Sequence, residues 1–182
     1  MTPTPVTNSY IETIEDCDAR LEDDPRATAF LILDDGPKTW YLQEATRVID
    51  ALPLRGERYE PYWIKSGSQY DVNADGLTQV LEFPRFIDGV VVDWDYGTEL
   101  PIIPTDVIRA CLEEALALYA FYSDSDNVDR KSAKDQGVQN YNLGGVYSES
   151  LGSSVADKNF GLRSMAAYRL LKKYIEMNPH VL

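Results

Sequence analysis

The 182-residue chain has little of the side-chain chemistry on which most enzymes depend. It contains one histidine, His180, and two cysteines, Cys17 and Cys111, which lie far apart in the sequence. Catalysis by a Ser–His or Cys–His pair needs a histidine held in a fixed geometry, which a residue so near the C-terminus does not offer. A structural zinc site needs four ligands, and two distant cysteines with one histidine near the C-terminus do not supply them. Gly144-Gly145 is not followed by the Lys-Ser/Thr of a phosphate-binding loop. We therefore expect a protein without catalytic activity.

Long hydrophobic runs are also missing. No apolar stretch approaches the roughly 18 residues that a membrane-spanning helix needs. The first residues, 1–5, show no positive region followed by an apolar one, as a secretory signal would. These features predict a protein made in the cytoplasm without a membrane partner. There, Cys17 and Cys111 should stay reduced as small buried side chains of helices.

Basic residues are scarce, with 17 Lys and Arg against 30 Asp and Glu and a net charge of −13. This balance argues against a strong non-specific nucleic-acid binder, because such a protein uses Lys and Arg to displace counterions from phosphates. The charge is uneven: residues 1–126 carry 25 acids and 9 bases, whereas residues 127–182 carry 5 acids and 8 bases. Either the acidic surface serves solubility, or opposite halves of neighbouring copies attract each other.

Apolar spacing and capping residues predict a mainly α fold, a small helical bundle in one domain over residues 1–182. Thr13 caps a first helix that runs to about Glu22, and Pro53 ends a second that starts near Asp34 or Asp35. The broadest apolar face belongs to a helix that follows Pro104, so this helix should be central and buried. A last helix is expected over residues 162–177. The apolar stretch 27–33 is compatible with helix or strand.

Two regions break the helical pattern. Residues 54–103 form a long irregular insertion rich in Gly, Pro, Asn and Asp, with short strands expected at 80–83 and 90–94. Residues 137–150 read as a protruding β-hairpin with its turn near Gly144-Gly145. The arms of this hairpin have little to bury, and a two-stranded ribbon is marginal alone, so we expect it to need a partner surface.

The irregular region contains a pattern typical of a calcium loop. Asp71, Asn73 and Asp75 present oxygens at alternate positions, a glycine follows, and Glu82 would close the site with two oxygens. The flanks do not predict the two helices of an EF-hand, because Pro84 stands where the exit helix should run. The alternative is an Asx-type turn in an acidic insertion. No cofactor is required, and calcium, if bound, would brace the insertion.

Aromatic residues scattered over 54–103 raise the alternative of base stacking on single-stranded nucleic acid. That mode needs a positive groove beside the rings. Residues 54–103 hold four bases against nine acids. The aromatic residues are therefore interpreted as core or interface positions.

Several short segments, taken in order, resemble one family. They are Asn8-Ser9-Tyr10-Ile11 with the helix that follows, Leu42–Asp50 with its Ala-Thr and Ile-Asp, Leu54-Arg55-Gly56, Gln79–Arg85 with its Phe-Pro-Arg, and Ile103-Pro104 with the start of the central helix. Together they are similar to a family of tailed phages and prophages, the head–tail connectors or adaptors, often labelled DnaT-like single-stranded DNA-binding proteins. About fifteen residues between Gly56 and Gln79, which include the calcium-like loop, are an insertion relative to that pattern.

The resemblance implies a structural protein of the virion neck, a ring of twelve copies seated under the portal protein. Such a ring extends the DNA channel, lets duplex DNA pass without specific binding, and docks tail or further neck proteins. The candidate contact residues are Arg85 in the Phe-Pro-Arg turn, where it would tie the turn to the acidic body, Tyr141, Val146 and Tyr147 in the hairpin, and Val181 and Leu182 at the tail. A single-stranded DNA-binding module and a calcium-stabilised interaction module stay open as alternatives.

Overall fold

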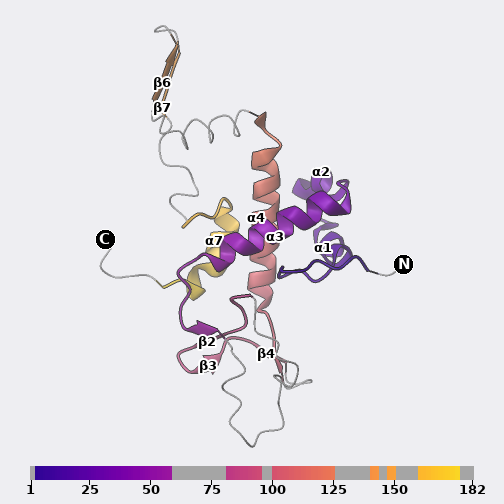
Figure 1. The fold of residues 1–182 in the computed structure, drawn as a ribbon, viewed down its shortest axis with the longest axis vertical. Coiled ribbons are helices and arrows are strands. Elements are labelled where there is room, and N and C mark those ends of the chain that lie inside the picture. Colours follow the sequence, from indigo (N-terminus) through magenta and orange to yellow (C-terminus); the bar gives the residue numbers. More distant parts are fainter. Residues whose placement is uncertain are drawn as a thin grey trace, which may run out of the picture.

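Helix α4 (Thr105–Tyr122) is the axis of the fold, and α3 (Asp35–Asp50) and α7 (Met165–Leu171) pack against it (Figure 1). The computed structural model describes residues 3–58, 81–95, 100–125, 140–143, 147–150 and 160–176. Within these ranges the fold is mainly α with a β-hairpin, as the sequence predicts. The broad apolar face of α4 is buried, which confirms its central place.

Helices make up most of residues 14–50. Helix α1 (Ile14–Leu21) begins after Thr13, whose side chain accepts a hydrogen bond from the Asp16 amide and so caps the helix. The stretch that the sequence leaves ambiguous is also helical, with a 3-10 turn η1 (Pro25–Ala27) followed by α2 (Thr28–Leu31). Pro25 suits the first position of such a turn, because its missing N–H needs no partner there.

The core is continuous from the N-terminal segment to the last helix. Its buried polar group Thr46 donates to the Leu42 carbonyl (2.9 Å) and accepts from the Tyr10 amide (3.2 Å). Both cysteines are buried and free, as predicted. Burial raises the pKa of the Cys17 thiol to about 12 and that of Cys111 to about 11. Both thiols are therefore protonated at neutral pH and unsuited to nucleophilic chemistry.

The irregular region contains short antiparallel strands. Strand β2 (Arg85–Ile87) lies between β1 (Glu57–Arg58) and β3 (Val90–Val91), and β4 (Trp94–Asp95) pairs with β5 (Leu100–Pro101). The prediction of a strand at 80–83 is wrong for residues 81–83, because these residues form a bend before β2. The expected strand at 90–94 is divided between β3 and β4. Pro84 has no amide hydrogen for a sheet ladder, so pairing begins only after it.

The predicted hairpin is present. Strands β6 (Asn140–Leu143) and β7 (Tyr147–Ser150) pair in antiparallel register, with Tyr141 opposite Glu149 and Leu143 opposite Tyr147. In Figure 1 the hairpin stands apart from the helical body, beyond the C-terminal end of α4.

The last helix is shorter than the predicted span of 162–177. Ser164 caps α7, and a 3-10 turn η3 (Lys172–Tyr174) follows it. The helix ends there because Ile175 becomes extended and pairs with Leu54. This tertiary contact, and not Pro179, stops the helix.

Candidate functional site: a clamped junction and a basic pocket

The segment after α3 and the segment after α7 join by backbone hydrogen bonds. The Arg55 amide donates to the Tyr174 carbonyl (2.7 Å), and the Glu176 amide donates to the Pro53 carbonyl (2.7 Å). Between them, Leu54 and Ile175 form an antiparallel bridge. These bonds fix two segments that lie about 120 positions apart in the chain.

Arg85 holds the same junction from its inner side. Its guanidinium donates to the carbonyls of Arg55 (2.9 Å), Gly56 (2.7 Å) and Leu54 (3.3 Å), and to the Glu82 carboxylate. Only 5% of Arg85 is exposed. The planar fork of five N–H donors suits three successive carbonyls, so one side chain binds the backbone of residues 54–56. We call this arrangement the arginine clamp.

Gly56 is required where the clamp closes. Its φ is +74°, and a Cβ atom there would lie 1.8 Å from the Phe86 carbonyl oxygen. Any other residue at this position must displace strand β2, because that oxygen belongs to backbone. The Arg-Gly and Phe-Pro-Arg segments are therefore two halves of one structural unit.

Carboxylates beside the clamp are engaged by donors. Glu82 binds both Arg58 and Arg85, and Asp50 accepts a hydrogen bond from the Tyr10 hydroxyl. Burial raises the pKa of Asp50, and the hydrogen bond from Tyr10 offsets part of that rise. Burial and the nearby Asp50 charge likewise raise the pKa of the Tyr10 phenol, so it stays a donor.

An aromatic stack backs these polar groups. Phe83, 1% exposed, packs edge-to-face between Tyr10 (ring centroids 6.0 Å apart) and Tyr174 (5.2 Å). Edge-to-face contacts of this kind add to the hydrophobic contribution of the rings. The stack joins the N-terminal segment, the Phe-Pro-Arg turn and the end of η3.

The outer side of the junction is a pocket of about 620 Å³. It is lined mainly by cations, in a chain whose net charge is −13; the lining residues are Arg55, Arg169, Lys172, Lys173, Ile175 and Glu176. We call it the basic pocket. Arg55, Ile175 and Glu176 belong both to the lining and to the paired segments of the junction, so the clamp that binds the Arg55 carbonyl also holds a lining residue in place.

Two of the four cations have partners. Arg55 pairs with the exposed Asp88 (3.0 Å), and Lys173 pairs with Asp106 in the first turn of α4 (2.6 Å). The hydrogen bond to Asp106 raises the pKa of Lys173. Within the described ranges, Arg169 and Lys172 make no ion pair. The pocket therefore presents two cations without an ion pair and one carboxylate, Glu176, and this net positive lining suits an anionic ligand.

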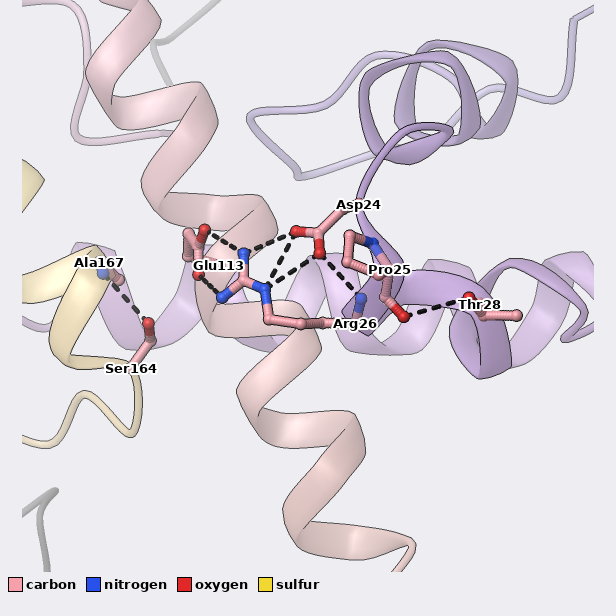
Figure 2. A network of polar contacts seen from close by, with 7 residues as sticks. All are labelled: Asp24, Pro25, Arg26, Thr28, Glu113, Ser164 and Ala167. Atoms are coloured by element: carbon pink, nitrogen blue, oxygen red, sulfur yellow. Dashed lines mark hydrogen bonds and ion pairs between the residues drawn. The ribbon is translucent and has the colours of Figure 1, made fainter.

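Helix α7 is held in place by a buried acid of α4. Glu114, fully buried, accepts hydrogen bonds from the amides of Arg163 (2.9 Å) and Ser164 (2.8 Å). Burial raises its pKa, while these two amides act in the opposite direction. Ser164 in turn accepts from the Ala167 amide (3.1 Å), and Figure 2 shows this cap beside α4. The orientation of Arg169 toward the pocket thus depends on Glu114.

The neighbouring Glu113 has a different partner, Arg26 of η1. Arg26 lies between Asp24 (2.6 Å) and Glu113 (2.7 Å) and ties η1 to α4 (Figure 2). This ion-pair network is exposed, so it adds little to stability on its own. Its effect is to fix the N-terminal helices against one side of α4.

The predicted contact and metal residues have different places. Arg85 binds Glu82, the residue before the Phe-Pro-Arg turn, and its burial leaves it almost no surface for a partner. Tyr141 and Tyr147 lie in β6 and β7. Outside the described residues lie Asp71, Asn73, Asp75, Val146, His180, Val181 and Leu182.

No group of three or more His, Cys, Asp or Glu is placed to hold a metal ion in the part of the chain that the structure describes. Of the calcium candidates, only Glu82 falls in that part, and two guanidinium groups occupy its oxygens. Calcium binding at Glu82 would have to break these bonds.

The basic pocket has no counterpart among the residues predicted from the sequence. Its one local signal is the basic run of Arg169, Lys172 and Lys173 in a chain that is otherwise acidic. Arg55 and Glu176 complete it only through the tertiary pairing of the junction.

Comparisons with protein-family models, with curated proteins and with solved structures found no match. Among the helices that the structure describes, none has both the length and the apolar character needed to cross a membrane.

Proposed function

We propose that this chain is a structural head–tail adaptor of a tailed phage or prophage. It acts without catalytic turnover, as a ring of copies in the virion neck under the portal protein. The ring extends the channel for passing duplex DNA and docks tail or further neck proteins.

The observation that carries the proposal is where the family-like segments lie. Four separate segments of the resemblance meet at the arginine clamp and its aromatic stack. They contribute Tyr10, Asp50, the Leu54–Gly56 segment and the Phe83–Arg85 turn. Four segments joined by mutual contacts fit a shared fold better than four chance similarities. Their roles are structural, which agrees with a protein that works by geometry.

The hairpin gives a second argument for assembly. Among the described strands, β6 and β7 pair only with each other. In Figure 1 this two-stranded ribbon stands apart from the helical body. Such a ribbon is marginal alone and suits contact with another subunit.

The single-stranded DNA alternative finds less support. Base stacking requires exposed aromatic rings beside cations, and the lining of the basic pocket contains no aromatic residue. Titration with single-stranded DNA at low and at physiological salt tests this alternative. Binding that survives physiological salt would favour it over the adaptor.

The calcium-stabilised alternative is tested by thermal unfolding with and without millimolar calcium. Specific binding to the folded protein raises the melting temperature by mass action. An unchanged melting temperature would remove this alternative.

The adaptor proposal itself is tested by light scattering and electron microscopy of the purified chain, alone and mixed with the portal protein of the same phage or prophage. We expect rings, either free or formed on the portal. A chain that stays monomeric and does not bind the portal would contradict the proposal.

A further inference from the structure

We propose that the basic pocket of one copy receives the acidic surface around α1 and α2 of a second copy, in a head-to-tail contact. The inference rests on the proposed function, because it names the contact that joins neighbouring copies of the ring. The occupant is a set of side-chain carboxylates from a folded protein surface.

The pocket has the features of a preformed site for carboxylates. Its lining residues Arg55 and Glu176 are fixed by backbone hydrogen bonds, and the salt bridge to Asp106 holds Lys173. Arg169 and Lys172 remain without an ion pair in the described ranges and are exposed. Two cations match two carboxylates in charge, and Glu176 in the lining offsets one of these cations, so the pocket suits a small number of carboxylates.

The complementary carboxylates lie in the segments that flank α1 and α2. Four carboxylates there are exposed and make no hydrogen bond or ion pair through their side chains within the described ranges; they are Glu12, Glu22, Asp23 and Asp34. We call these four residues the acidic face. Ile32, which follows α2 and lies two residues before Asp34 in the chain, is 82% exposed. An exposed isoleucine close in sequence to an unpaired carboxylate suits a contact that excludes water.

The two surfaces lie on opposite sides of the molecule. In Figure 1, α1 and α2 lie on one side of α4, and α7 lies on the other. A contact between different surfaces of two identical copies is heterologous, so it repeats from copy to copy and closes into a ring when the rotation allows. The separation of basic pocket and acidic face across α4 therefore fits a ring contact better than a two-fold dimer.

Carboxylates fit the pocket better than the phosphates of a nucleic acid do. A DNA strand carries charge along its whole length and is bound by an extended basic track. Here Glu176 lines the pocket, and Asp88 and Asp106 compensate two of its cations. The remaining positive charge is local, which suits a few side chains and opposes a long polyanion.

The contact is tested by zero-length carbodiimide coupling of lysines to carboxylates. The sample is a mixture of ¹⁵N-labelled and unlabelled protein, and the coupled peptides are identified by mass spectrometry. Coupling is performed on the assembled ring, with the portal present where the ring requires it. We expect peptides of mixed isotope that join Lys172 or Lys173 to the acidic face. The intramolecular pairs Lys173–Asp106 and Lys38–Asp18 serve as internal controls, which must couple within one isotope. If the two control pairs couple but no mixed-isotope peptide from the pocket is found, the proposal is overturned.

A charge exchange gives an independent test. The variants Arg169→Glu/Lys172→Glu and Glu22→Lys/Asp23→Lys should each weaken association at least tenfold in sedimentation or light scattering. An equal mixture of the two should associate again, because each reversed surface then meets a complementary partner. Arg47→Glu, a charge reversal at an exposed site of α3, serves as control and should leave association unchanged.

The results separate the two proposals. If both double variants still form rings on the portal, the adaptor function stands and the pocket assignment is wrong. If the wild-type chain neither associates nor binds the portal, both fail. If duplex DNA protects Lys172 from coupling while the acidic face remains uncoupled, the pocket binds nucleic acid and the proposal is overturned.

Discussion

Arg85 and Arg55 both contact the junction between the segments after α3 and α7, but they have opposite environments. The Arg85 side chain is 6% exposed and binds three carbonyls and Glu82, whereas that of Arg55 is 43% exposed and pairs only with the surface residue Asp88. A buried cation is committed to its own chain, because its removal leaves polar groups unpaired in the interior. An exposed cation contributes little to folding and is free to bind a partner. The clamp thus serves the fold, and the basic pocket leaves its exposed cations available to a partner.

Replacement of Arg85 by Met should have the largest effect. It leaves three carbonyls and the Glu82 carboxylate without this donor, so we expect a loss of about 3–5 kcal/mol in the free energy of unfolding, measured with urea. Arg55→Met removes only an exposed pair and should cost at most about 1 kcal/mol. Equal losses for the two variants would contradict the distinction between clamp and pocket.

Gly56→Ala tests the closure of the clamp. The new methyl group would meet the Phe86 carbonyl oxygen, so we expect a loss of roughly 3 kcal/mol in urea unfolding. Gly89→Ala is the matched control, since Gly89 also has positive φ (+80°) but open space at its Cβ position. The control should cost only about 1–2 kcal/mol from backbone strain. A smaller loss at Gly56 than at Gly89 would show that β2 shifts freely.

Glu114→Gln tests how α4 supports the pocket side of the molecule. Because its pKa is raised in the folded state, the folded chain binds more protons than the unfolded one just above pH 4.5, the ordinary value for Glu. The contribution of Glu114 to stability is therefore full below pH 4.5 and is lost as the pH rises through the raised pKa. Urea unfolding from pH 4 to 7 should show a larger advantage of wild type over Gln at low pH. An advantage that grows with pH would contradict the raised pKa.

The smallest effect on stability is expected for Arg169→Glu/Lys172→Glu. Both residues are exposed and have no ion pair in the described ranges, so each change should alter the free energy of unfolding by about 0.5 kcal/mol or less. Thermal unfolding of the monomer should match wild type while association is lost. A large drop in melting temperature would assign these cations to the fold.

Local signals in the sequence determined most of the helical architecture. Thr13 and Pro104 mark the starts of α1 and α4, and the apolar width of α4 predicts its central place. Gly144-Gly145 in the sequence predicts the hairpin. The helical patterns around Cys17 and Cys111 predict that both cysteines are buried and reduced. These features depend on neighbours a few residues apart, so periodicity and capping rules reach them.

Only the tertiary structure decided where the chain's short segments meet. The end of the last helix depends on the bridge between Leu54 and Ile175, and the short strands follow the Phe-Pro-Arg turn, so their predicted bounds were partly wrong. The Arg-Gly segment and Arg85 are recognisable in the sequence, but their common role needs three carbonyls placed beside one guanidinium. The basic pocket likewise unites Arg55 with Arg169 and Lys172. Contacts between distant segments depend on packing of the whole core, which local sequence rules do not encode.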